Sequence, residues 1–170
     1  MILLTLGTYP APFDRLISAV DRGIQSGLIK EEVVAQIGYS QYIPRAMTYH
    51  KLLDKAEFEK LFRAADGIIS HAGMGNIAMA LDAGKPILVF PRLAKYSEIV
   101  NEHQLETARK FEELGHVLAA YTDEDLYAKI SLLKSFVPKK RTATPEGVAR
   151  RVGDFLWSLM PADAREQPKP

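Results

Sequence analysis

Short runs of apolar residues alternate along the chain with longer segments in which apolar residues recur every three or four positions. The short runs predict buried strands, and the longer segments predict amphipathic helices. Strands are expected at residues 2–6, 33–37, 67–70, 87–90 and 117–119, with at most a short one at 46–49.

Capping residues set the expected helix boundaries. Asp54 with Glu57 predicts a helix that runs to about residue 65, and Thr122 with Asp125 predicts one that runs to about residue 136. Thr144 followed by proline predicts the start of the last helix, because proline fits the first helical position. Further helices are expected at residues 13–24, 76–83 and 101–114.

Strands that alternate with helices predict an α/β fold, a Rossmann-like parallel sheet with helices on both faces. Residues 1–160 are expected to form one domain, and the polar, proline-rich segment 161–170 a disordered tail. Ligands of such sheets bind at the carboxyl ends of the strands. The loops after Leu6, Ser70 and Phe90 are therefore the places where a site is expected.

Composition narrows the classes of function. The chain has 170 residues and a net charge of +1, so no overall field favours nucleic acid, and no nucleic-acid partner is expected. It has no cysteine, which excludes disulfides and thiolate metal sites. Its four histidines lack metal-ligand spacing, so no metal is expected. The lack of cysteine suits a cytosolic protein. No apolar run approaches the ~20 residues of a membrane span, so the chain is not expected to cross a bilayer.

The segment from Ser70 to Asn76 carries the clearest candidate chemistry, because it follows a strand and opens a helix. Gly73 and Gly75 would let a ligand approach the backbone, and the helix start would offer N–H groups to a phosphate. Ser70, His71 and Asn76 add side-chain donors. A tight turn with glycines for packing alone is an equal alternative.

Three further segments have two interpretations each. Glu102, His103 and Gln104 could bind sugar hydroxyls, although their spacing alone favours a solvated helix start. The basic residues 139–141 could contact anionic lipid, but such a run is usually a solvated loop. The apolar residues 155–157 are most simply core, with docking on a partner as the alternative.

Together these segments resemble the C-terminal domain of glycosyltransferase family 28, over residues 1–120. The resemblance rests on the runs ADGIISHAGMG, AGKPI and NEHQL and on the shorter segments 5–8, 13–16 and 36–38. The chain is most similar to free-standing subunits of two-component UDP-sugar transferases. These are subunits of bacterial capsule and exopolysaccharide synthesis and the soluble subunit of the transferase that makes dolichol-linked chitobiose.

The resemblance implies one half of a GT-B fold, the half that binds the donor. A membrane-anchored partner subunit would supply the acceptor domain and hold this chain at the cytoplasmic face of the membrane. The implied reaction is an inverting, metal-independent transfer of a hexose or uronic acid from a UDP-sugar to a lipid-linked saccharide. No cofactor is implied, since the UDP-sugar is a substrate.

The resemblance also places the site. The loop with Ser70, His71, Gly73, Met74, Gly75 and Asn76 would hold the diphosphate, with Gly7 and Thr8 beside it. Glu102, His103 and Gln104 would face the donor sugar. Arg92 is a candidate phosphate contact, and a surface cation is the equal alternative. The general base would come from the partner, and His71 is the candidate within this chain.

One departure from the family pattern bears on the nucleotide. Many GT-B transferases grip the ribose with a glutamate in the helix after the glycine loop, and Met79 stands at that position here. Backbone groups or Asp82 would then hold the ribose. This departure keeps open a second function, a non-catalytic subunit that scaffolds or regulates a partner transferase. If the donor sugar is glucuronic acid, its carboxylate would need a cation near the sugar pocket, and Arg92, Lys95 or Arg109 could supply it.

Overall fold

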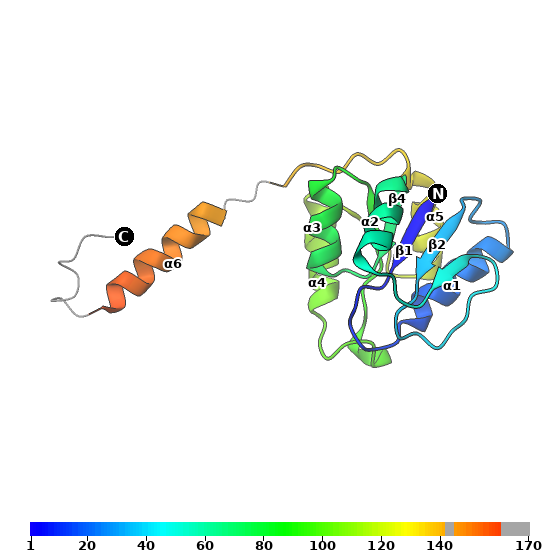
Figure 1. Cartoon of the computed structure of the whole chain (residues 1–170), viewed down its shortest axis with the longest axis horizontal. Coiled ribbons are helices and arrows are strands. Elements are labelled where there is room, and N and C mark those ends of the chain that lie inside the picture. The colour runs from blue at the N-terminus through cyan, green and yellow to red at the C-terminus, as the bar shows by residue number, and fades with distance from the viewer. Residues whose placement is uncertain (142–144, 161–170) are drawn as a thin grey trace. The chain divides into compact units, whose positions relative to one another are not determined.

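The computed structural model describes residues 1–141 and 145–160. Its strands form a six-stranded sheet in the order β3-β2-β1-β4-β5-β6 in which every neighbouring pair is parallel (Figure 1). The strands are β1 (Ile2–Thr5), β2 (Val33–Gln36), β3 (Thr48–His50), β4 (Gly67–Ser70), β5 (Ile87–Val89) and β6 (Leu118–Ala119). The parallel α/β sheet expected from the sequence is confirmed.

Helices follow the strands as the hydrophobic pattern predicts. They are α1 (Asp14–Gln25), α2 (Lys55–Ala64), α3 (Met74–Asp82), α4 (His103–Glu113), α5 (Asp123–Leu133) and α6 (Pro145–Leu159), with a 3-10 helix η1 (Ala94–Tyr96). Two caps are confirmed, because Asp54 accepts a hydrogen bond from the N–H of Glu57 and Thr122 from that of Asp125. Thr144 and the tail expected at 161–170 lie outside the described residues.

The sheet is covered on both faces by apolar side chains. On one face, Leu4 packs in a cluster with residues of α1 and α5 such as Leu16 and Leu126. On the other face, Leu3 packs in a cluster with residues of α2, α3 and α4. All four residues of β1 are buried. Burial on both faces explains why the strands read as continuous apolar runs rather than as alternating ones.

The chain divides into two compact units, Met1–Lys140 and Arg141–Pro170. The sheet and its helices belong to the first unit and α6 belongs to the second, and the single domain expected over residues 1–160 stays a prediction. Phe155 of α6 is 61% exposed and Leu156 is 56% exposed. Neither side chain is enclosed within its own unit, and the two interpretations of this cluster, core and docking on a partner, both stay predictions.

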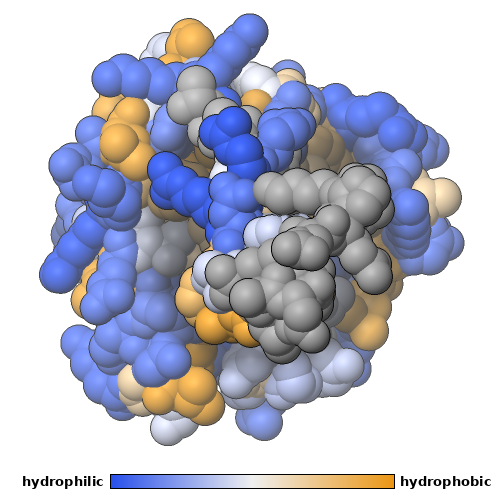
Figure 2. All heavy atoms as spheres, turned by 90° about the vertical axis from the view of Figure 1, so that its left-hand side faces the viewer, coloured by the Kyte–Doolittle hydropathy of each residue, from blue (hydrophilic) through white to orange (hydrophobic). Residues whose placement is uncertain are grey.

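Exposed apolar side chains are scattered over the rest of the surface. On the face drawn in Figure 2, hydrophilic residues predominate and apolar residues form separate patches. None of the helices in the described residues is both long and apolar enough to traverse a bilayer.

Candidate functional site

The loops after β1 and β4 emerge side by side at the carboxyl edge of the sheet. Thr5 at the end of β1 is paired with Ser70 at the end of β4. The strand order also reverses between these two strands, since β2 and β3 lie on one side of β1 and β4, β5 and β6 on the other. Such a switch point is where parallel sheets bind ligands.

Helix α3 starts at this edge without a side-chain cap. It begins at Met74, two residues before the start expected from the sequence, so Gly75 and Asn76 lie in its first turn. Its N-cap residue is Gly73, and its first turn contains no acidic residue. The first N–H groups of a helix have no acceptor within it, and the helix dipole adds partial positive charge there. This end of α3 is therefore suited to an anion.

The three glycines at this edge differ in what surrounds the position of a Cβ atom. A Cβ atom on Gly7 would lie 2.8 Å from Cε1 of His71, and one on Gly73 would lie 2.2 Å from Nε2 of the same ring. A Cβ atom on Gly75 would meet nothing within 4 Å. Gly7 and Gly73 therefore make room for the His71 ring, and only Gly75 of the three leaves space open to a ligand.

The His71 ring is tied to α3 through Ser70. Nδ2 of Asn76 donates a hydrogen bond to Oγ of Ser70 at 2.7 Å, and that oxygen lies 3.2 Å from Nδ1 of His71. Burial, and secondarily the positive charge of Arg92, lowers the pKa of His71 to about 4, against an opposing hydrogen bond to the Thr5 backbone. His71 is therefore neutral at pH 7 and offers a donor and an acceptor rather than a charge.

Two hollows meet at the start of α3. One has a volume of about 450 Å³ and is lined by Gly7, Thr8, Tyr9, Pro10, His71, Gly75 and Asn76. The other has a volume of about 260 Å³ and is lined by Thr5, Gly7, Thr8, Gln36, Leu53, Asp54, Lys55, Phe58, Gly75, Asn76 and Met79. Four residues line both, so an elongated ligand that crosses the start of α3 would enter both hollows.

The structure thus brings together Gly7, Thr8, His71, Gly75 and Asn76 as the sequence predicted. Ser70 is fully buried behind them and acts through its hydrogen bonds. Sequence reasoning missed the wall formed by residues 9–10 and the second hollow with Gln36 and Lys55. Gln36 carried a usable signal, because it is a polar residue at the carboxyl end of a strand that is otherwise apolar, and it is buried.

The segment Glu102 to Gln104 lies outside these two hollows. Gln104 is buried, and its Oε1 accepts a hydrogen bond from the backbone N–H of Arg92 at 3.1 Å. Glu102 accepts one from the N–H of Ala94 at 3.1 Å, and the backbone N–H of the exposed His103 donates to Oδ1 of Asn101 at 3.2 Å. In the described residues, the side chains of Glu102 and Gln104 therefore brace the link between β5 and α4.

Arg92 is 1% exposed, so the interpretation as a surface cation is wrong. Its Nη1 donates to the backbone oxygens of Ala11 at 3.1 Å, Pro12 at 3.0 Å and Glu98 at 3.3 Å. Its guanidinium carbon lies 4.6 Å from the centroid of the Phe13 ring. Arg92 therefore joins the link after β5 to the loop after β1.

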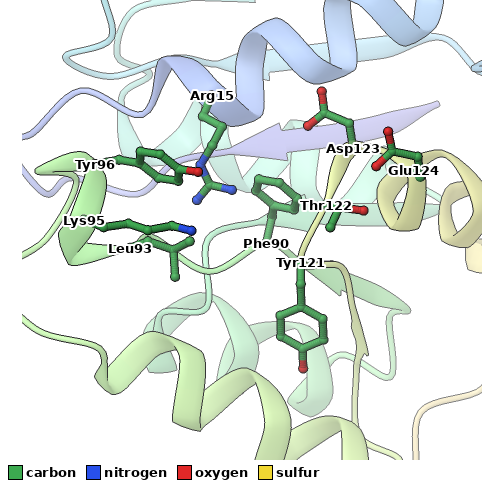
Figure 3. A pocket seen from close by; sticks show the side chains of 9 residues that line it. All are labelled: Arg15, Phe90, Leu93, Lys95, Tyr96, Tyr121, Thr122, Asp123 and Glu124. Carbon is green, nitrogen blue, oxygen red and sulfur yellow. The ribbon is translucent and has the colours of Figure 1, made fainter.

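Another hollow of about 350 Å³ lies farther along the same edge, beyond β5 and β6, beside the loop after Phe90 where a site was also expected. Its lining residues are Arg15, Phe90, Leu93, Lys95, Tyr96, Tyr121, Thr122, Asp123 and Glu124 (Figure 3). The Arg15 guanidinium lies 4.4 Å from the centroid of the Phe90 ring and forms an ion pair with Glu98 at 2.8 Å. Arg15 is thus already engaged by groups of the protein.

Comparison with known proteins shows the family of this chain. The model of the glycosyltransferase family 28 C-terminal domain matches residues 1–151. The chain belongs to this family. It is also related to the UDP-N-acetylglucosamine transferase subunit ALG13 of Homo sapiens, with 31% identity over 126 residues, which are 68% of this chain and 10% of the human protein. ALG13 of Cryptococcus neoformans is 34% identical over 105 residues, which cover 59% of this chain and 50% of the relative.

Solved structures of glycosyltransferases share the fold of this family 28 chain. The NMR structure of ALG13 matches with a TM-score of 0.55 and 19% identity, over 88% of this chain and 93% of that one. The glycosyltransferase of kitacinnamycin matches with a TM-score of 0.57 and 20% identity, over 94% of this chain and 43% of that one. The sheet and its helices therefore correspond to one half of a GT-B fold. The chain spans about a tenth of the length of the human and mouse relatives.

Proposed function

We propose that the chain is the donor-binding catalytic subunit of a two-component inverting glycosyltransferase. It moves a hexose or uronic acid from a UDP-sugar to a lipid-linked acceptor in the synthesis of a polysaccharide. The observation that carries the proposal is the uncapped start of α3, which opens on two hollows at the switch point of a family 28 donor domain.

The donor diphosphate lies across the start of α3 in this proposal. The N–H groups of Gly75 and Asn76 face the negative charge, with the helix dipole behind them. When the bond from the sugar to the phosphate breaks, negative charge grows on the leaving UDP. Donors that are already fixed in place stabilise that charge without reorganising. Thr8 and the neutral His71 line the same hollow and add hydrogen bonds.

The nucleoside enters the smaller hollow, in which Met79 stands where many GT-B enzymes have the ribose glutamate. A thioether accepts hydrogen bonds only weakly, so the ribose hydroxyls need other partners. Gln36 and Lys55 line this hollow and carry suitable groups. Asp82 is a poorer candidate, because it ends α3 at the end of the helix away from the glycine loop.

A membrane-anchored partner subunit supplies the acceptor domain and the general base, and it holds the chain at the cytoplasmic face of the membrane. The relatives that match are themselves described as subunits. Helix α6 offers a surface for such a partner, because four of its large apolar residues follow a spacing of four, three and four and are more than half exposed. They are Val148, Val152, Phe155 and Leu159.

The first experiment is calorimetric titration of the purified chain with UDP and, for comparison, with ADP. Selective binding of UDP that is lost in the double variant His71→Ala and Asn76→Ala supports the donor site at the start of α3. The control is Glu59→Ala, which removes an exposed carboxylate on α2. If UDP binds equally well to the double variant, the site lies elsewhere.

The alternative function is a subunit that keeps the donor fold without turnover and scaffolds or regulates a partner transferase. The replacement of the ribose glutamate by Met79 favours it. The two functions separate in a transfer assay with the co-expressed partner subunit and radiolabelled UDP-sugars. A catalytic subunit loses transfer with the His71 and Asn76 variants, whereas transfer that does not depend on them indicates a scaffold.

A further inference from the structure

Arg92 is a buried cation that packs against aromatic rings and backbone oxygens. Its guanidinium lies 4.6 Å from the Phe13 ring and 5.5 Å from the Tyr9 ring, and its Nη1 donates to three carbonyl oxygens. In the described part of the chain it makes no ion pair with a carboxylate. Burial lowers the pKa of Arg92, and the Glu98 carboxylate opposes this only in part and is itself paired with Arg15.

Burying Arg92 in this way costs free energy of folding, which a residue that only fills space would not require. Burial lowers the pKa of Arg92, which means that its charge is held against a desolvation penalty. Its Nε is also buried without a hydrogen-bond partner. Apolar residues of similar volume often replace buried charges without loss of stability. A methionine would avoid those costs but would leave three carbonyl oxygens without their donor, so holding these groups is one role of the guanidinium, and its charge calls for a further explanation.

Two features connect Arg92 with the donor hollow. The backbone oxygens of Ala11 and Pro12, which Arg92 holds, belong to the same loop as Thr8, Tyr9 and Pro10, which wall that hollow. The positive charge of Arg92 also reaches the hollow, because it depresses the pKa of His71, another lining residue. Arg92 thus affects the hollow in two ways, through the loop that it holds and through its charge near His71.

We propose that Arg92 is a positioning residue of the donor site. It anchors the loop of residues 8–12 at the edge of the hollow, and its positive charge, which no ion pair neutralises, favours the donor diphosphate without contact. This proposal rests on the proposed function for the identity of the ligand. It changes the role expected of Arg92 from a phosphate contact to a support that acts through the loop and through the electric field.

The test compares Arg92→Met and Arg92→Lys with the wild-type chain, and Arg63→Met serves as the matched control on the exposed face of α2. Three quantities are measured on the full chain: the midpoint of thermal unfolding, the Kd for UDP at low and high salt, and the pKa of His71 by NMR titration. The His71 measurement needs no ligand, so it remains informative if UDP does not bind.

For Arg92→Met we expect a lower unfolding midpoint, because three carbonyl oxygens lose their donor, together with about tenfold weaker UDP binding, a smaller salt dependence and a higher pKa for His71. Arg92→Lys keeps the charge, so the pKa of His71 stays low. Arg63→Met changes none of the three. If Arg92→Met lowers only the unfolding midpoint, and the pKa of His71 and the salt dependence stay unchanged, Arg92 is structural and the proposal is wrong. The wild-type chain could bind no UDP while the pKa of His71 still responds to the Arg92 variants as expected. That result would contradict the proposed function and would still support the electrostatic effect of Arg92 on the hollow.

Discussion

Gly73 lies so close to His71 that a Cβ atom on the glycine would come within 2.2 Å of the imidazole Nε2. The backbone of Gly73 has a φ of −92°, which any residue can adopt, so the contact rather than the conformation requires glycine. The backbone at the start of α3 and the ring of His71 are therefore packed against each other. Their relative position is set by the lack of a side chain.

Gly73→Ala is expected to push the His71 ring out of place. Overpacking of this kind costs roughly 1–3 kcal/mol of the free energy of unfolding. Because the displaced ring enters the donor hollow, UDP binding should also weaken by about tenfold, which corresponds to about 1.4 kcal/mol. Chemical denaturation and calorimetry measure the two effects. Wild-type UDP affinity in this variant would show that the ring position does not matter for binding.

Gly75→Ala is expected to have the opposite effect on stability. The added Cβ meets no atom within 4 Å, and alanine favours a helix over glycine by up to about 1 kcal/mol. The methyl group does enter the space proposed for the diphosphate, so UDP binding should weaken while the unfolding midpoint holds or rises. Gly153→Ala in α6, where a Cβ also meets nothing within 4 Å, is the matched control and should leave UDP binding unchanged.

His71 should make the fold less stable in mild acid. Its pKa is about 4 in the folded chain against 6.5 as the ordinary value, so between these pH values the unfolded chain binds more protons. Stability is therefore complete above pH 6.5 and falls as the pH drops to 4, by on the order of 3 kcal/mol. Denaturant unfolding of the wild type and of His71→Asn across this range gives the comparison. A loss of equal size in the variant would assign it to other groups.

Asp21 should be essential to the link between β2 and β3. Its buried carboxylate accepts hydrogen bonds from the hydroxyl of Tyr42 at 2.8 Å and from the N–H groups of Arg45 at 2.9 Å and Ala46 at 2.8 Å. Asp21→Ala leaves these donors unpaired and should cost about 2–4 kcal/mol of the free energy of unfolding. Asp54→Ala removes only the cap of α2 and should cost about 1 kcal/mol. Similar costs for the two variants would contradict this account.

The sheet and its functional edge could be predicted from the sequence because the signals are local. Apolar runs mark the buried strands, and caps such as Asp54 bond to residues three positions away. The sequence predicts the start of α3 two residues too late, because glycine in the first turn of the helix is a poor helix former and is typical of a loop. Tertiary packing on the sheet outweighs that preference.

Arg92 shows what the sequence could not reveal. Its hydrogen-bond acceptors are backbone oxygens of residues 80 and 81 positions away, and a carbonyl leaves no trace in the pattern of side chains. The spacing of Glu102 and Gln104 alone favours a solvated helix start, whereas the family resemblance implies that they face the donor sugar. That assignment stays a prediction, and in the structure both bond to backbone N–H groups of the segment before α4. Polarity alone cannot distinguish a side chain that braces a loop from one that binds a ligand.

The contact between His71 and the glycines on either side of it also constrains how this site can evolve. An alanine at position 73 is harmful only while a ring occupies position 71, so the two positions should show strong epistasis. A lineage that loses the histidine first could then accept a larger residue at position 73. Histidine could not easily be regained at position 71 afterwards, because its ring would clash with that residue. Among homologues, the identity of the residue at position 71 should therefore predict whether glycine is kept at position 73, whereas Gly7, with its φ of +69°, should stay glycine in either case.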